Sequence, residues 1–170
     1  GGRAGEVTRP SVSSAAALAC AIALGAAVVA AAAPAGFVKP GKDEKCPVCG
    51  MFVARYPDWL AAAELADGSR VVFDGPKDLF KLLLDPGKFL PGRTRADVKA
   101  VTVTDYYGLA PVDARAAVFV LGGDVLGPMG RELVPFARRE DAEEFGRDHH
   151  GTRILTFDEV TPDLVRSLDR

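Results

Sequence analysis

Sulfur and imidazole are scarce in this chain of 170 residues, which has three cysteines, two methionines and two histidines. A structural zinc site normally takes four protein ligands, and no second cysteine pair follows Cys46 and Cys49. His149 and His150 would have to complete such a site. The net charge is also small, −2 at pH 7, because 21 Lys and Arg residues stand against 23 Asp and Glu residues. Without a basic stripe, we expect no nucleic-acid partner.

Two patterns of catalysis and nucleotide binding are missing as well. The segment Gly122-Gly123-Asp124 lacks the lysine and serine that a phosphate-binding loop needs. No serine or histidine nucleophile arrangement accompanies Asp74 and Gly75, which are interpreted as turn residues. The sequence therefore favours a protein that is not an enzyme.

A long apolar run lies near the N-terminus. Residues 15–33 carry no charge, follow Arg3 and Arg9, and lead into Ala-Pro-Ala and Gly36. This order is typical of an export signal, although the run is long enough to span a bilayer. Lipidation at Cys20 is a third alternative. We predict that residues 1–35 are a signal peptide or N-terminal membrane anchor, and that the remainder lies in the periplasm or on the outer face of the cytoplasmic membrane.

The remaining sequence predicts a linker at 36–45 and one folded domain at 46–170. In the first half of that domain, hydrophobic patterns and the Asp67-Gly68 turn signal predict strands at 59–65 and 69–73, a helix at 77–84 and a strand at 98–104. In the second half, they predict strands at 116–121 and 132–136, a helix at 139–149 and a strand at 153–157. A short helix at 162–168, capped by Thr161 or Asp163, closes the chain.

The same order of elements thus occurs twice. Aligning Val-Val-Phe at 71–73 with Val-Pro-Phe at 134–136 places Asp78 on Asp141 and Leu82 on Phe145. Each half is too small to bury its own hydrophobic faces. We therefore predict an α+β fold of two pseudo-repeated ββαβ halves packed together.

The candidate site begins with Cys46-Pro-Val-Cys49-Gly-Met51. Two cysteines at this spacing can bind one metal ion, form a disulfide or exchange disulfides. A thioether is a poor zinc ligand but suits Cu(I), so Met51 favours copper unless it simply packs in the core.

Two residues of the second half are further candidate ligands. Met129 lies between glycines in Gly127-Pro128-Met129-Gly130, where its thioether projects from a loop or packs beneath it. His149 and His150 end a predicted helix, where an imidazole serves as a cap or as a metal ligand. We prefer His150 as the ligand, since the Gly151 turn frees it to move.

Five segments together resemble the NosL family of nitrous oxide reductase accessory proteins. They are Cys-Pro-Val-Cys-Gly-Met at 46–51, Val-Phe-Asp-Gly-Pro-Lys-Asp-Leu-Phe at 72–80, Thr-Asp-Tyr-Tyr at 104–107, Gly-Gly-Asp-Val-Leu-Gly-Pro-Met-Gly-Arg-Glu-Leu-Val-Pro-Phe at 122–136, and His-Gly at 150–151. The resemblance runs from about residue 46 to residue 160. It implies a fold of two ββαβ halves, distantly similar to organomercurial lyase.

The resemblance also implies a function. Such a protein is a Cu(I) chaperone, not an enzyme, that delivers copper outside the cytoplasmic membrane for the copper–sulfide centre of nitrous oxide reductase, together with a membrane ABC-type complex. The matching metal positions here are Cys46, Cys49, Met51, Met129 and His150. Many members are lipoproteins whose cysteine opens the mature chain, and this N-terminus departs from that pattern.

Two alternatives remain at this point. An organomercurial-lyase-like thiol enzyme needs a nearby proton donor and product release, and we expect no acid beside the cysteine pair. A structural zinc or disulfide module that binds another protein needs neither methionine.

Overall fold

The structure is a computed structural model that describes residues 1–2 and 39–170. Residues 3–35 of the predicted signal or anchor, including Cys20, and 36–38 of the predicted linker lie outside this part. Within the described residues, no helix combines the length and the apolar character needed to cross a bilayer. At the end of the predicted linker, the carbonyl of Glu44 accepts the Val53 N–H at 3.0 Å, so this residue is already attached to the fold.

The first half forms a four-stranded antiparallel sheet in the order β2-β1-β3-β4. Its strands are β1 (Ala61–Leu65), β2 (Arg70–Phe73), β3 (Val98–Thr104) and β4 (Pro111–Asp113). Two helices, α1 (Pro76–Leu84) and the short α2 (Pro86–Phe89), connect β2 to β3. β4 and α2 are additions to the predicted ββαβ unit.

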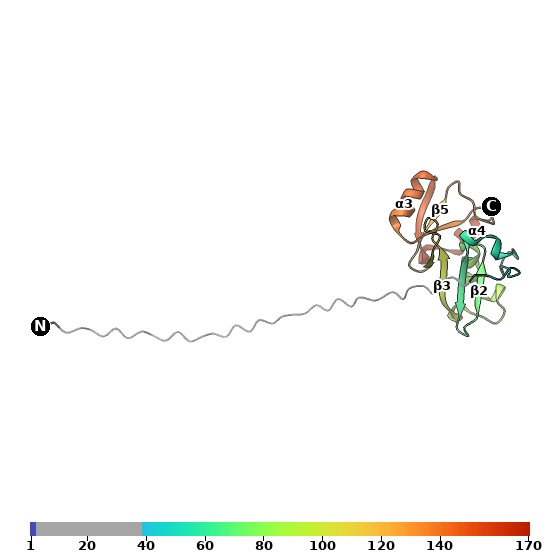
Figure 1. The fold of residues 1–170 in the computed structure, drawn as a ribbon, viewed down its shortest axis with the longest axis horizontal. Coiled ribbons are helices and arrows are strands. Elements are labelled where there is room, and N and C mark those ends of the chain that lie inside the picture. Colours follow the sequence, from blue (N-terminus) through green and yellow to red (C-terminus); the bar gives the residue numbers. More distant parts are fainter. Residues whose placement is uncertain (3–38) are drawn as a thin grey trace. The chain divides into compact units, whose positions relative to one another are not determined.

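The second half forms a three-stranded antiparallel sheet in the order β6-β5-β7. Its strands are β5 (Val118–Gly122), β6 (Leu133–Phe136) and β7 (Gly151–Thr156), and α3 (Arg139–Asp148) connects β6 to β7. α4 (Pro162–Ser167) follows, and the Thr161 hydroxyl caps it by accepting the Leu164 N–H. Figure 1 shows β2 and β3 in the green to yellow part of the ribbon and β5 and α3 in the orange part.

Short 3₁₀ helices complete the fold. They are η1 (Val53–Arg55), η2 (Pro57–Trp59), η3 (Arg95–Asp97) and η4 (Phe157–Glu159). The strand predicted at 59–65 begins only at Ala61, because Trp59 belongs to η2. Pro57 favours the helical turn of η2 and lacks the N–H that a strand ladder needs.

The predicted duplication is confirmed in detail. In each ββαβ unit the first strand lies between the other two strands of that unit, and its first residue pairs with a phenylalanine, Ala61 with Phe73 and Val118 with Phe136. A register shift follows the fourth residue of each first strand, Glu64 and Leu121. The fold is α+β with two ββαβ halves.

The two halves share a hydrophobic core. Phe80 of α1 packs edge-to-face on Phe119 of β5, with ring centroids 5.1 Å apart, and Phe157 lies equally close to Phe80. A backbone hydrogen bond also joins the halves, because the Tyr106 N–H donates to the Pro135 carbonyl at 2.9 Å. Neither half buries its sheet alone, as the size argument predicts.

Candidate metal centre

The cysteine pair lies in a tight turn before the first strand. The Gly50 N–H donates to the Cys46 carbonyl at 2.9 Å, and the Cys46 N–H donates to the Met51 carbonyl at the same distance. Gly50 has φ +80°, a conformation that favours glycine. The turn therefore holds both thiols on one short, hydrogen-bonded segment.

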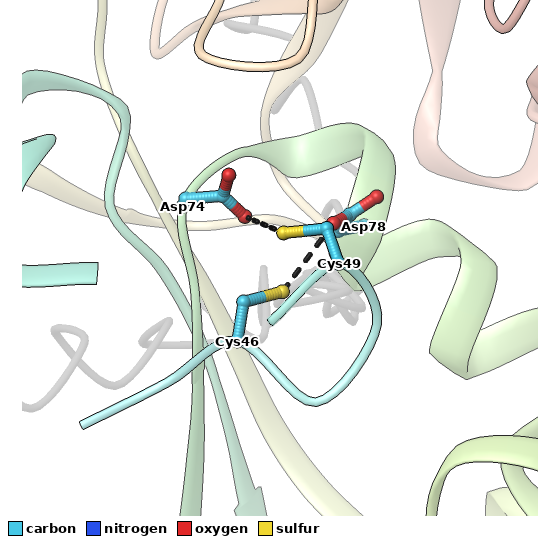
Figure 2. Close-up of side chains that lie close together, drawn as sticks. All are labelled: Cys46, Cys49, Asp74 and Asp78. Atoms are coloured by element: carbon cyan, nitrogen blue, oxygen red, sulfur yellow. Dashed lines mark hydrogen bonds between the residues drawn. The ribbon is translucent and has the colours of Figure 1, made fainter. Parts of the chain in front are cut away.

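Two aspartates face these thiols. Asp74 directly follows β2, and Asp78 lies in the first turn of α1. The Cys49 thiol donates to Asp74 Oδ1 at 3.2 Å and the Cys46 thiol donates to Asp78 Oδ2 at 3.3 Å (Figure 2). One sulfur or oxygen atom of each residue lies within 4.8 Å of the corresponding atoms of the other three. The four side chains form a compact group with the composition of a metal site.

Burial makes this group unusual. Asp74, Asp78 and Cys46 are 1–2% exposed, and Cys49 is half-buried. Asp74 Oδ2 and Asp78 Oδ1 have no hydrogen-bond partner, although Lys81 Nζ lies 3.4 Å from Asp78 Oδ1. Buried carboxylate oxygens are rarely left without hydrogen bonds, because losing water costs free energy that a partner must restore.

The surroundings keep both thiols protonated at neutral pH. Burial raises the pKa of Cys46 far above its usual range, and the negative charge of Asp78 adds to that rise. Burial, with smaller contributions from Asp78 and Asp74, raises the pKa of Cys49 to about 12. Backbone N–H groups oppose both shifts without cancelling them. Both cysteines are free thiols, and metal binding must release their protons.

The aspartates correct two interpretations of the sequence. Asp74 is not merely a turn residue, because its side chain accepts a thiol hydrogen bond. The expectation that no acid lies beside the cysteine pair is wrong, because Asp74 and Asp78, although distant in sequence, contact the two thiols in the fold. The reason is topological, since β2 and the start of α1 fold back against the 46–51 turn.

A signal for one of these residues is present in the sequence. Asp78 precedes Leu82 by four residues, so the two side chains share one face of the predicted helix. Leu82 is buried, and Asp78 is therefore an acid on a buried helix face. Such a position indicates a specific partner for the acid.

The Met129 loop of the second half lies against α1. Lys77, which is 1% exposed, donates from Nζ to the Met129 carbonyl at 2.9 Å and lies 3.3 Å from Asp169 Oδ1. Gly127 and Gly130 exchange backbone hydrogen bonds of 2.8 and 3.1 Å and close the loop. Met129 itself is 44% exposed. Because Lys77 is the neighbour of Asp78, the loop is anchored one residue from the thiol–carboxylate group.

Glu132 completes this anchor. Its Oε1 accepts the Lys77 N–H at 2.6 Å and the Leu133 N–H at 2.9 Å, so a side chain from the second half caps α1. A Cβ at Gly75 would clash with Glu132 Oε2, so a glycine leaves room for this cap. Burial raises the pKa of Glu132 to about 8, against the opposing effect of the two N–H groups. Neither Lys77 nor Glu132 was identified from the sequence as part of the site.

Met51 is half-buried at the end of the cysteine turn. Its carbonyl accepts the Cys46 N–H, so its backbone is part of the turn. The role of its thioether as a ligand stays a prediction.

The histidines take different places. His149 caps α3, as one of the two predicted roles requires, and its Nδ1 lies 2.9 Å from Asp124 Oδ1. His150 is exposed and has φ +60°. In residues 39–170, no hydrogen bond or ion pair joins His150 to the cysteines or methionines. His150 as a ligand stays a prediction.

Topology nevertheless brings His150 and the Met129 loop to one end of the second sheet. Gly151 at the start of β7 pairs with Gly122 at the end of β5, and Leu133 at the start of β6 pairs with Leu121. The loop that carries Met129 leaves the sheet at this end. His150 directly precedes Gly151 and therefore lies at the same end of the sheet.

The arrangement can hold a metal ion in two chemically different ways. The thiols of Cys46 and Cys49 are soft donors, whereas the carboxylates of Asp74 and Asp78 are hard donors. The two predicted thioether donors belong to the cysteine turn, in the case of Met51, and to the loop whose backbone contacts Lys77 of α1, in the case of Met129.

Known proteins are similar to this chain in sequence and in fold. Residues 37–165 match the family model NosL. The chain is 26% identical over 125 residues to the copper-binding lipoprotein NosL of Stutzerimonas stutzeri, a match that covers 73% of this chain and 65% of that protein's length. The crystal structure of the copper chaperone NosL from Shewanella denitrificans is similar with a TM-score of 0.61 and 28% identity, covering 75% of this chain and 99% of that one. The chain belongs to the NosL family.

Proposed function

We propose that this protein is an extracytoplasmic Cu(I) metallochaperone that delivers copper for assembly of the copper–sulfide centre of nitrous oxide reductase. Family membership supports this proposal, as do the names of the relatives, a copper-binding lipoprotein and a copper chaperone. The membrane ABC-type maturation complex is the proposed partner. The lipoprotein relative supports export and attachment to the membrane.

One observation carries the copper proposal furthest. The buried Lys77 side chain binds the Met129 carbonyl, and the next residue, Asp78, accepts the Cys46 thiol hydrogen bond. A continuous set of contacts therefore links the cysteine turn of the first half to the methionine loop of the second half. Such an anchor favours the approach of soft donors from both halves to one ion.

The ligands we propose are Cys46 and Cys49 with Met129, and with Met51 or His150 as the additional donor. Cu(I) accepts few ligands and prefers thiolate and thioether sulfur. When the ion binds, the S–H protons leave to solvent and the sulfur atoms bind copper. A soft donor of the partner then replaces these ligands one at a time, beginning with the exposed Met129.

Anaerobic loading with Cu(I) and native mass spectrometry of the full chain test the proposal. We expect one Cu(I) per wild-type chain, weaker retention in Met129→Ala, and wild-type retention in the control Leu126→Ala, which changes another exposed side chain of the same loop. One Zn(II) that remains bound regardless of Met129, with no copper taken up, would refute the chaperone function.

The thiol–carboxylate pairs favour a second candidate, an organomercurial-lyase-like enzyme. In that reaction a thiol sulfur binds mercury, the carbon–mercury bond breaks, and a proton held between thiol and carboxylate passes to carbon. Asp74 and Asp78 supply the acid for this reaction, because they contact the cysteine thiols although they are distant from them in sequence. Release of hydrocarbon from an organomercurial substrate distinguishes this enzyme from the copper chaperone.

A further inference from the structure

We propose that Asp169, two residues after α4, is a positioning residue of the proposed copper site: it holds the buried Lys77 side chain, and through it the loop that carries Met129, against α1. This inference rests on the proposed function, in which Met129 is a copper ligand. It assigns a role to the segment after α4, to which none of the predicted ligands belongs.

Lys77 holds the Met129 loop at two points. Its Nζ donates to the Met129 carbonyl at 2.9 Å, and its backbone N–H donates to Glu132 Oε1 at 2.6 Å. These bonds lie on either side of Gly130, whose φ of +82° marks the turn of the loop. The position of Met129 relative to α1 therefore depends on where the Lys77 side chain lies.

The ammonium group of Lys77 needs a negative partner. Lys77 is only 1% exposed, and a lysine is rarely buried this far without a counter-charge. The Met129 carbonyl supplies a hydrogen bond but no charge. The nearby Glu132 is largely protonated at pH 7, because burial raises its pKa to about 8. Asp169 Oδ1, which lies 3.3 Å from Lys77 Nζ, supplies the negative charge.

A second lysine fixes Asp169 itself. Lys81 Nζ lies 2.9 Å from Asp169 Oδ1 and 3.4 Å from Oδ1 of Asp78, the residue that accepts the Cys46 thiol hydrogen bond. Partial burial acts against ionisation, but Lys81 and Lys77 hold the pKa of Asp169 below its usual range. Asp169 therefore stays ionised at neutral pH and is held between two lysines that lie about one helical turn apart on α1.

Attachment of α4 to the fold does not account for these ion pairs. Leu164, Val165 and Leu168 are buried in the shared core and attach this segment through apolar contacts. An exposed ion pair adds little to stability, and the Asp169 side chain is 46% exposed. We therefore expect a substitution of Asp169 to change the position of Lys77 and to leave the core intact.

The first measurement uses the reduced, metal-free full chain. Amide hydrogen exchange, followed by NMR, reports the two backbone bonds that close the loop, which Gly127 and Gly130 donate to each other. We expect Asp169→Ala to speed exchange of both amides at least about threefold, with exchange at Val120 of β5 unchanged. Asp169→Glu, which keeps the charge, should keep exchange slow. Asp158→Ala, on the exposed surface, is the control.

The second measurement follows the loss of Cu(I) from the loaded full chain to a Cu(I)-specific chelator under anaerobic conditions. We expect Asp169→Ala to release Cu(I) at least about threefold faster than wild type. In the Met129→Ala background the same substitution should have no further effect, because Asp169 acts through the Met129 loop.

Wild-type exchange of the Gly127 and Gly130 amides in Asp169→Ala would overturn the inference. Equal acceleration of the Val120 amide would overturn it too, because it would show a general loss of stability. An undiminished effect on Cu(I) release in the Met129→Ala background has the same consequence. Absence of Cu(I) binding in wild type refutes the proposed function instead, and hydrogen exchange of the metal-free chain then still decides whether Asp169 positions the loop.

Discussion

At the scale of single residues, the cysteine turn is shaped by what faces it. Cys46 and Cys49 could be recognised from their spacing alone, since few arrangements other than a metal site or disulfide use it. Their aspartate partners were not recognised, because Asp74 and Asp78 lie 25 and 32 residues further along the chain. Only the return of β2 and α1 to the turn creates those contacts.

Thiol reactivity tests this description. Because the thiolate is the nucleophile and the pKa of Cys49 is raised to about 12, its alkylation by iodoacetamide at pH 8 should be slower in the folded chain than in denaturant. Asp74→Asn removes a negative charge beside the thiol and so lowers the pKa of Cys49. Alkylation should then be faster, by roughly tenfold for each pKa unit by which the pKa of Cys49 falls.

Peptide mass spectrometry of the alkylated chain measures this rate, with Asp58→Asn as the control. Alkylation of folded Cys49 at the denatured rate would mean that the thiol is not held by Asp74.

At the scale of secondary structure, hydrophobic periodicity located every strand and helix of both ββαβ units. The α1 and α3 helices begin and end within one or two residues of the predicted bounds. β4 was not predicted because Pro111–Asp113 is too short for an alternating pattern. The anchor between α1 and the Met129 loop was not predicted either, since Lys77 and Glu132 read as ordinary surface charges, yet both are buried.

The Glu132 cap makes stability depend on pH. The pKa of Glu132 is about 8 in the fold and near 4.5 in the unfolded chain, so between these values the folded state holds one more proton. The free energy of unfolding therefore falls as pH rises through this window, by up to about 1.4 kcal/mol per pH unit from this group. Glu132→Gln cannot ionise and should lose less stability from pH 5 to pH 8.

Denaturant unfolding of both proteins at several pH values checks this expectation. Equal pH dependence in wild type and Glu132→Gln would show that Glu132 is already ionised in the fold. Glu159→Gln is a suitable control, because that carboxylate is exposed and its pKa is lowered rather than raised.

At the scale of the whole molecule, duplication supplies the scaffold but not a symmetric site. The two sheets match in strand order, register and the position of the bulge. The sulfur donors do not match, since the cysteine turn precedes β1 whereas Met129 lies between β5 and β6. The halves meet through a shared core and through the hydrogen bond from Lys77 to the Met129 carbonyl, and Asp78 of the candidate site is the next residue of α1.

The most direct test of the copper proposal is an anaerobic titration of the reduced full chain with Cu(I) against a Cu(I)-specific chelator, comparing wild type with the double variant Cys46→Ser, Cys49→Ser. Circular dichroism verifies that the variant, which changes a buried residue, is folded. We predict one tightly held Cu(I) per wild-type chain and none that competes with the chelator in the folded variant. Equal Cu(I) affinity in the two proteins would contradict the assignment of these thiols as the copper ligands.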